Sequence, residues 1–387
     1  MDLVRAPVDG RPITRAAFTD PNRAFQVCTR CVMDTTDAGI EFLGDEGCNR
    51  CAKARRVASQ FRSVDSDISR EVERIRSAGR GSPYDCLIGV SGGVDSSTCL
   101  VLAAELGLRP LVVHVDAGWN SSEAVHNVEQ LCLRLDLDLE TVVIDWEPLR
   151  RLHLAFLAAG VANQDTPQDH VLFGALYGVA ERLGIRTVVE GTNWQTESIL
   201  PKSFGHTAKD AVQLLDVARK FGAGDIRQLP VLSELRRGVY LPRVFGLRKF
   251  APLNETDYRP RAAKERLINE FGWLEYGAKH HESRWTQFFQ RYLLPYRFGY
   301  DKRKPHLSSL IVSGEIERDE ALILLREPLH TEEGLAADFD FVARKLGISV
   351  AELGDLVETP LRHYSEFRNH DRTVRLIKRL NRLVDRA

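Results

Sequence analysis

The chain lacks three features that would each point to a class of protein. Its 53 Lys and Arg nearly balance 54 Asp and Glu, so with a net charge of -1 no overall positive field attracts it to a nucleic acid. No run of 18 apolar residues occurs, so no membrane-spanning segment is predicted. The first residues lack the basic and apolar plan of a signal peptide, and we therefore expect a cytoplasmic protein of ordinary globular composition.

Cysteine is scarce, with seven in 387 residues, yet four of the seven stand in two pairs. Cys28 and Cys31 form one C-x-x-C, and Cys48 and Cys51 form another. Two such pairs at this spacing are typical of a closed, structural zinc site with four thiolate ligands. Disulfides and a redox C-x-x-C are the alternatives. A cytoplasmic location disfavours the first, and the presence of two matched pairs disfavours the second.

A glycine-rich segment beginning at Tyr84 reads "YDCLIGVSGGVDSSTCLVLAAELG". Its pattern predicts a strand over 84–90, a turn and then a helix over 95–106. Glycines between a buried strand and a helix let backbone N–H groups converge on an anion, helped by the helix dipole. No Walker A lysine follows, and Asp95 in the first helical turn would repel phosphates unless a cation such as Mg²⁺ intervened. A plain strand–turn–helix with an N-capping serine is the alternative.

The string S-G-G-x-D-S resembles the PP-loop of the ATP pyrophosphatase superfamily. Members of this superfamily attach AMP to a substrate oxygen and release pyrophosphate. The resemblance implies a fold of the adenine nucleotide alpha hydrolase type, with Asp95 near the magnesium ion. The residues that it implies for phosphate binding are Ser91, Gly92, Gly93, Asp95 and Ser96.

Strand and helix patterns alternate after this loop, which predicts an α/β fold with a doubly wound parallel sheet. Further strands are expected over 109–115, over 139–144 and from residue 187, with helices over 121–135 and from about residue 169. Ligands of such sheets bind at the carboxyl ends of the strands, so the loops 116–120 and 191–197 should converge on the phosphate loop. The candidates that follow for ATP binding are Asp116, Gly191 and Asn193.

The segment 276–314, "YGAKHHESRWTQFFQRYLLPYRFGYDKRKPHLSSLIVSG", closely resembles the N-acetyl sugar amidotransferases of surface-polysaccharide biosynthesis. That family's pattern runs G-G-K-H-x-E-S, T-x-F-x-Q and D-K-R-x-x-H-L-S-x-L-I. The segments "CTRCVMDTTD", "NQDTPQDH" and "EGTNWQTE" are similar to the family too, so the resemblance covers about residues 28–328. Ala278 departs from the pattern, where a glycine is expected. Trp194 lies in a loop whose composition varies between relatives, which leaves the sugar open.

The resemblance implies a defined reaction in lipopolysaccharide O-antigen biosynthesis. ATP adenylates the amide oxygen of a nucleotide-activated N-acetyl sugar, and ammonia then displaces AMP to leave an acetamidino sugar. Positioning, a metal ion and cationic groups supply most of the catalytic effect in such chemistry. The family also implies a separate glutaminase that supplies the ammonia, with a barrel-shaped tunnel partner. The resemblance leaves open whether the chain forms a homo-oligomer.

Polar clusters within the family motifs are the candidates for catalysis and substrate binding. The catalytic candidates are Asp95, Lys279, His280, Glu282, Lys302 and Arg303, and the substrate-binding candidates are Gln164, Asp165, His170, Gln195, Glu197 and His306. A solvated helix turn around 279–282 and a solvated basic face around 301–306 are the alternatives. Aromatic residues at helical spacing follow the first cluster and predict a buried helix: Trp285, Phe288, Phe289 and Tyr292.

Changes of pattern divide the chain into four predicted regions. They are an N-terminal segment with the cysteine module (1–56), a PP-loop ATP-binding domain (57–230), a helical substrate-binding and catalytic region (231–328) and a small helical C-terminal region (329–387). A linker helix over 57–77 is expected to begin the second region. In the fourth, residues 339–356 predict two helices with a turn at Gly347, and residues 372–386 predict a basic amphipathic helix.

A tRNA thiolation enzyme of the PP-loop type is the alternative function, because such enzymes also combine this loop with zinc cysteines. They need reactive thiols or a sulphur-carrying partner, and a basic path for RNA. The remaining cysteines, Cys86, Cys99 and Cys132, lie in apolar patterns that predict burial. The cysteine module itself is acidic, which disfavours contact with phosphates. An inactive ATP-binding scaffold is disfavoured because Asp95 and the loop glycines are present.

Overall fold

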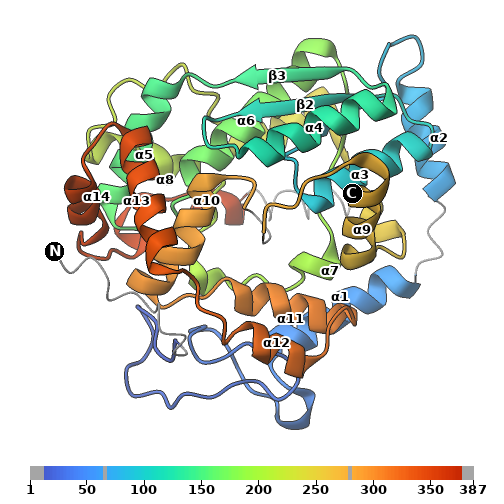
Figure 1. The fold of residues 1–387 in the computed structure, drawn as a ribbon. Coiled ribbons are helices and arrows are strands. Elements are labelled where there is room, and N and C mark those ends of the chain that lie inside the picture. Colours follow the sequence, from blue (N-terminus) through green and yellow to red (C-terminus); the bar gives the residue numbers. More distant parts are fainter. Residues whose placement is uncertain (1–12, 64–67, 278–280, 377–387) are drawn as a thin grey trace.

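The computed structural model describes residues 13–63, 68–277 and 281–376. It contains a five-stranded parallel sheet in the order β3-β2-β1-β4-β5, of which β2 and β3 lie at the top of the view in Figure 1. The order reverses between β1 and β4, and ligands of such folds bind at this switch point. The predicted doubly wound sheet is therefore confirmed. The strands are β1 (Cys86–Gly89), β2 (Pro110–Asp116), β3 (Leu139–Val143), β4 (Thr187–Val189) and β5 (Arg248–Phe250).

Strand β5 was not predicted, and it moves the limit of the sheet. It pairs with β4 although it comes from the region 231–328, so the predicted boundary at residue 230 does not separate the sheet from the later helices. Two of its three residues, Arg248 and Lys249, are exposed. A strand this short and polar shows no apolar alternation from which it could be recognised.

The predicted linker helix over 57–77 is also wrong in its limits. The structure has α1 (Asn49–Ser63) and α2 (Ile68–Ala78) in its place. Helix α1 begins directly after Cys48, so the second cysteine pair lies on the first turn of this helix. Residues three apart on a helical turn face the same side, so both cysteines of this pair can bind the same metal ion.

Helices cover both faces of the sheet, and the side chains of β1 alternate between them. Leu87 packs with helices α5 (Trp146–Ala159), α6 (Thr166–Leu183) and α8 (Ala211–Lys220). Cys86 and Ile88 pack on the opposite face with α2, α3 (Val94–Glu105), α4 (Ser122–Leu135) and α9 (Pro260–Phe271). All three strand residues are fully buried, as expected for a parallel sheet covered on both sides.

Several of the remaining helices form a further core with the cysteine module, which Figure 1 shows in blue at the opposite side of the molecule from β3. The predicted aromatic residues, including Trp285 and Phe288, are buried there, which confirms their assignment to a core. The α-helices not yet named are α7 (Trp194–Glu197), α10 (Arg284–Phe288), α11 (Arg303–Ser313), α12 (Arg318–Leu324), α13 (Glu332–Leu346) and α14 (Val350–Val357). The π-helical segments are η3 (Arg236–Phe245) and η5 (Phe289–Phe298), and the 3₁₀ turns are η1 (Gly44–Glu46), η2 (Lys202–Phe204), η4 (Pro252–Glu255) and η6 (Tyr364–Glu366).

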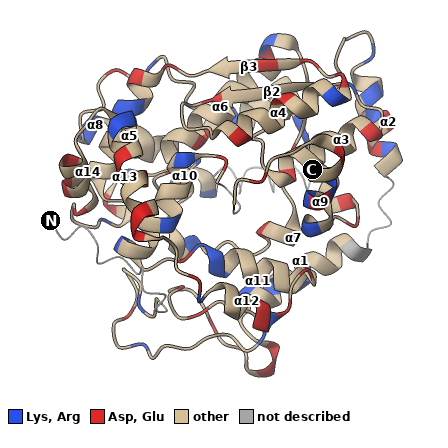
Figure 2. Cartoon of the chain, viewed as in Figure 1, with Lys and Arg blue, Asp and Glu red and all other residues tan. Residues whose placement is uncertain are grey.

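The C-terminal region follows its predicted pattern as far as it is described. Helices α13 and α14 flank a turn at Gly347, and Ser349 and Glu352 form a capping box that starts α14. Most of the predicted basic helix 372–386 lies outside the described residues. Among the described helices, none combines the length and apolar character needed to cross a membrane. Basic and acidic residues are interspersed over the outer helices in the view of Figure 2.

Candidate active site

The phosphate loop leaves β1 and enters α3 through two glycines. Gly92 has a φ of 82°, and a Cβ at this position would lie 2.4 Å from the carbonyl oxygen of Ala124 in α4. A side chain is therefore excluded both by the backbone conformation and by the closeness of α4. Gly93 has an extended conformation and precedes the first residue of α3. Helix α3 thus points its N-terminus toward the turn, which favours an anion there.

Two serine hydroxyls and two side chains from other elements hold the loop in shape. Ser91 donates its N–H to Ser96 Oγ at 3.3 Å, and Ser96 Oγ donates to the Gly93 carbonyl at 3.1 Å. Trp273 donates its indole N–H to the Gly92 carbonyl at 3.1 Å, and the Asn127 amide donates to the same oxygen at 3.4 Å. The loop is therefore preorganised from both flanks, so binding an anion requires little ordering.

Asp95 lies under this loop, at the switch point between β1 and β4. Its carboxylate accepts hydrogen bonds from Tyr258 Oη at 2.5 Å and from Thr196 Oγ1 at 3.2 Å. A Cβ on Gly191 would lie only 3.0 Å from the Asp95 backbone, so glycine permits the end of β4 to approach. Burial and the Asp95 carboxylate raise the pKa of Tyr258, which keeps its hydroxyl a donor. Carboxylate oxygens are ligands that Mg²⁺ prefers, so the donor chemistry of Asp95 fits a Mg²⁺ ion.

The end of β2 joins the same region through a chain of hydrogen bonds. Asp116 accepts from the Gly118 N–H at 2.7 Å and from the Asn120 amide at 3.3 Å. Asn120 also contacts His114 Nε2 at 3.0 Å, and His114 Nδ1 contacts the Val90 carbonyl at 3.0 Å. The three predicted segments at the strand ends therefore converge, whereas Asp116 itself serves to shape its own loop.

Glu282 connects the family motif of residues 276–314 with the phosphate loop. Its carboxylate accepts a hydrogen bond from Ser91 Oγ at 3.3 Å, and its carbonyl accepts from the Ser121 N–H at 2.9 Å. The next residue, Ser283, forms an isolated bridge with Asn120. Two other predicted catalytic residues of this motif, Lys279 and His280, lie outside the described residues.

A cavity of about 1110 Å³ lies beside the phosphate loop. Its lining includes Ser91, Glu282, Asp165, Asp169 and Lys302. It is also lined by residues that the sequence did not indicate: Lys202, His206, Lys209, Arg237, Tyr364, His370 and Asp371. These residues come from loops and helix ends without a repeated spacing, so no sequence signal marked them.

The two basic candidates that begin α11 have different surroundings. Lys302 faces the cavity, where burial lowers its pKa and the carboxylates of Asp165 and Asp169 oppose that shift. Arg303 instead forms an ion pair with Asp301 at 2.8 Å and donates to the backbone carbonyl of Glu327 at 2.8 Å. These contacts anchor the start of α11 and turn the guanidinium toward the segment after α12.

The predicted substrate-binding residues are spread over several places. Asp165 lines the cavity and accepts a hydrogen bond from Thr286 Oγ1 at 2.9 Å. Gln164 is buried and donates its amide to the carbonyls of Phe156 and Val161, at 3.0 and 2.8 Å. His170 lines a smaller pocket of about 170 Å³, and burial lowers its pKa to about 4.

The candidates beyond β4 lie on the side of the site that faces α11. Asn193 caps α7 by accepting from the Thr196 N–H at 2.9 Å, and Glu197 ends this short helix. Gln195 lines a separate pocket of about 400 Å³ together with Tyr258. His306 lies in α11, which packs against α7. None of these four residues is among those that line the large cavity, although the carboxylate of Glu197 acts on Lys302, which does line it.

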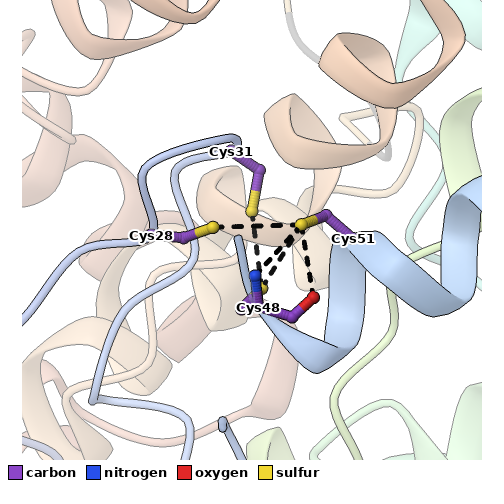
Figure 3. A group of neighbouring side chains, drawn as sticks. All are labelled: Cys28, Cys31, Cys48 and Cys51. Carbon is purple, nitrogen blue, oxygen red and sulfur yellow. Dashed lines mark hydrogen bonds between the residues drawn. The ribbon is translucent and has the colours of Figure 1, made fainter. Parts of the chain in front are cut away.

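The four paired cysteines form one buried cluster, shown in Figure 3. The Sγ atoms of Cys28 and Cys51 lie 3.9 Å apart, and those of Cys31 and Cys48 lie 3.7 Å apart. A tetrahedral zinc ion with Zn–S bonds of about 2.3 Å requires sulphur separations of roughly 3.8 Å. All four residues are free thiols with no exposed surface. Their arrangement fits zinc, which would close the site with four thiolates.

The cysteine cluster is attached to the helices that follow the family motif. Arg318 at the start of α12 donates to the carbonyl oxygens of Cys28 and Cys31, at 2.9 and 3.1 Å. The Val32 N–H donates to Ser308 Oγ of α11 at 3.2 Å. The module therefore joins the N-terminal segment to α11 and α12, which is the structural role expected from its acidic composition.

The other three cysteines are buried, as predicted. Burial raises the pKa of Cys86 to about 12 and that of Cys132 to about 11, and it raises the pKa of Cys99 as well. A thiol with a raised pKa forms little of the reactive thiolate at neutral pH. Their burial and raised pKa values therefore disfavour all three as the nucleophilic sulphur of a thiolation enzyme.

Comparison with known proteins supports part of this picture. Residues 282–382 match the family model described as the C-terminal domain of WbpG-like LPS biosynthesis proteins. No curated protein matches the chain. Two similar solved structures are an NMN synthetase from Francisella tularensis and an NH3-dependent NAD synthetase from Campylobacter jejuni.

The two structural similarities are remote. The first has 15% identity and a TM-score of 0.27 over 57% of this chain and 98% of that chain, and the second has 11% identity and a TM-score of 0.27 over 58% and 99%. They support no inference about the reaction. The match over 282–382 begins at Glu282, the residue that contacts the phosphate loop, and it confirms the predicted resemblance to a surface-polysaccharide family. Residues 282–382 thus match the C-terminal domain of WbpG-like LPS biosynthesis proteins, and in this chain they follow an α/β region with a five-stranded parallel sheet.

Proposed function

We propose that this chain is an ATP-dependent amidotransferase that converts the acetamido group of a nucleotide-activated N-acetyl sugar into an acetamidino group. One observation carries the proposal. The phosphate loop and the segment matched to the LPS biosynthesis family form walls of the same cavity, at Ser91 and Glu282. Its volume of about 1110 Å³ exceeds the range of roughly 300–1,000 Å³ of ordinary small-molecule pockets, which suits a large nucleotide-linked substrate.

The reaction proposed for this cavity has two steps. The amide oxygen of the sugar attacks the α-phosphorus of ATP and pyrophosphate leaves, which gives an adenylated amide. Ammonia then attacks the imidate carbon, loses its extra proton and expels AMP, which carries away the former amide oxygen. Adenylation is needed because an amide oxygen is otherwise a very poor leaving group. The N–H groups of the loop at Gly92 and Gly93 would hold the phosphates.

Charge in the cavity supports this assignment. Asp95 would hold Mg²⁺, which neutralises phosphate charge when bound. Lys302, Lys209 and Arg237 supply positive groups to the cavity lining. Such groups suit the diphosphate or carboxylate of a nucleotide-linked sugar acid. The carboxylate of Glu282, beside Ser91, would accept the proton that ammonia loses.

Ammonia is mostly protonated at neutral pH, so a dedicated supply would raise the rate. We assign this supply to a separate glutaminase, as the family resemblance implies. Free ammonium at high concentration should replace the partner, which makes the chain testable by itself. Location in the cytoplasm, where ATP and nucleotide sugars are available, is part of the same proposal.

The test is mass spectrometry of a reaction that contains the full chain, ATP, Mg²⁺, an ammonium salt and a panel of nucleotide-linked N-acetyl sugars, including uronic acids. The expected product has one oxygen replaced by NH, with AMP and pyrophosphate formed in equal amounts. Asp95→Asn is the matched inactive control, because asparagine retains an acceptor for Tyr258 while it removes the charge. AMP formation that depends on tRNA instead of on any sugar would contradict the proposal.

A further inference from the structure

A second group of metal-ligating side chains lies in the lining of the cavity. His206, His370 and Asp371 each offer a ligand atom within 4.8 Å of the others. The two imidazole centroids are 5.4 Å apart, and all three residues line the cavity. Two imidazoles and one carboxylate form a donor set that binds zinc and other divalent transition metals.

Each histidine of this group is oriented by a buried carboxylate. His206 Nε2 donates to Asp210 at 2.6 Å, and His370 Nδ1 donates to Glu234 at 2.5 Å. Asp210 is fully buried and Glu234 is 6% exposed. Because one ring nitrogen of each histidine donates to a carboxylate, the other ring nitrogen keeps its lone pair for a metal. Carboxylate–histidine pairs of this kind are the usual support of metal-binding histidines.

The surrounding structure holds these side chains in place. Asp210 caps α8 through the Gln213 N–H at 3.0 Å and also accepts the backbone N–H of His370 at 2.9 Å. The ring of His206 stacks on Tyr364, with centroids 4.2 Å apart and planes 6° from parallel. Two distant parts of the chain are therefore brought together with their rings already oriented.

We propose that His206, His370 and Asp371 bind one divalent transition-metal ion, with zinc as its natural occupant, and that an open coordination position of this ion faces the cavity. Three protein ligands leave a fourth tetrahedral position, unlike the closed cluster of four cysteines. The ligand atoms, which lie within 4.8 Å of one another, would take up separations of roughly 3.3 Å, as set by bonds of about 2.0 Å. An anionic oxygen of the molecule that fills the cavity is the suitable fourth ligand.

The same contacts have a purely structural explanation, in which they only tie the C-terminal segment to α8. That explanation requires the carboxylates of Asp210 and Glu234, but it gives no role to the carboxylate of Asp371. Asp371 accepts a weak hydrogen bond from Tyr364 Oη at 3.4 Å, which asparagine can also accept. Asp371→Asn therefore separates a metal site from an anchor.

The experiment measures zinc per chain in the full-length protein after loading with zinc and dialysis against metal-free buffer. Wild type and the control His126→Gln, which changes a histidine outside the group, should hold one equivalent more than Asp371→Asn and His206→Gln. Zinc in the cysteine cluster is the same in all four proteins and cancels in the comparison. Equal zinc content in wild type and Asp371→Asn would overturn the proposal, even if His206→Gln failed to fold.

Affinity gives a second measurement that an anchor would not alter. Glu234→Gln keeps an acceptor for the His370 N–H but removes the charge that makes the imidazole more basic. We expect zinc to bind this variant about 10–100-fold more weakly, as for other changes behind a ligand. Competition with a chelator measures this difference, with cobalt as a spectroscopic probe that separates nitrogen and oxygen ligands from thiolates. An unchanged affinity would contradict the assignment.

Discussion

The cysteine cluster and the group of His206, His370 and Asp371 are two candidate metal sites of opposite character. The cysteines come from one stretch of the chain, are fully buried and pack among aromatic residues such as Trp285 and Phe288. The second group joins distant segments, lines a cavity and offers three ligands. The closed site can contribute only to folding, whereas the open site can hold a ligand. The comparison shows how ligand number and burial separate a structural role from a binding role.

The largest loss of stability is expected when a cysteine ligand of the closed site is removed. Cys48→Ala should abolish zinc binding there and destabilise the fold by several kcal/mol, because structural zinc sites contribute up to about 10–16 kcal/mol to folding. Zinc analysis and thermal unfolding measure both consequences. Cys132→Ala is the matched control, since Cys132 is buried outside the cluster and should leave the zinc content unchanged. Full zinc and an unchanged melting temperature in Cys48→Ala would show that the cluster is not a metal site.

The next largest effect is expected from a change in the phosphate loop. In Gly92→Ala the new Cβ would meet the Ala124 carbonyl at 2.4 Å in a backbone with φ of 82°. We expect a loss of about 2–4 kcal/mol in stability and at least a 100-fold loss of AMP formation. Gly178→Ala is the control, because open space surrounds Gly178 in α6 and alanine favours a helix. Similar activity in both variants would mean that the loop does not hold the nucleotide.

Breaking the link between the cysteine cluster and the later helices should lower stability moderately. Arg318→Met removes the two hydrogen bonds to the carbonyls of Cys28 and Cys31 but keeps the length of the side chain. Hydrogen bonds from a charged donor contribute about 1.5–3 kcal/mol, so we expect a loss of that order with zinc still bound. Denaturant unfolding and zinc analysis test this together. Loss of zinc in this variant would show that the cluster depends on α12 for its ligand geometry.

His153 is a buried histidine that contacts an indole, whereas the cavity histidines contact carboxylates. His153 accepts a hydrogen bond from Trp119 Nε1 at 3.0 Å, and burial lowers its pKa to about 3. Below a pH of about 6.5 the unfolded chain takes up a proton that the folded chain refuses, so stability falls as the pH falls.

The slope attributable to His153 is roughly 1.4 kcal/mol per pH unit between about pH 6 and 4. His153→Gln keeps an acceptor for Trp119, and its free energy of unfolding should depend on pH less steeply by this amount. Denaturant unfolding of both proteins over this pH range provides the measurement. Parallel curves would show that His153 becomes protonated in the folded protein.

Much of the fold could be predicted because its signals are local. The strand before Ser91 and the helix after Gly93 form one continuous pattern, and the aromatic residues from Trp285 onward repeat at helical spacing. Strand β5 could not be predicted, because three residues become a strand only through pairing with β4. The limits of the linker helix were missed because α1 starts from the turn that holds Cys48.

The site was predicted less completely than the fold. The convergence of the strand ends follows from parallel topology, and the structure brings Gly191 against Asp95 as expected. The role of Arg303 as an anchor for α11 depends on a neighbour distant in sequence, the carbonyl of Glu327. Gln164 donates to the carbonyls of Phe156 and Val161, which are close in sequence but become buried with it only when the chain folds. A polar residue in a motif does not reveal whether its side chain faces a cavity or the protein interior.

The sequence by itself determined the phosphate loop, the parallel sheet and the paired cysteines. Each of these depends on spacing within one segment, where chain geometry restricts the possible structures. Only the tertiary structure decided which charged groups line the cavity and that His206 meets His370 and Asp371 there. Such encounters depend on how separately formed helices pack. Packing is governed by the shape and burial of many side chains at once, so no local pattern records its result.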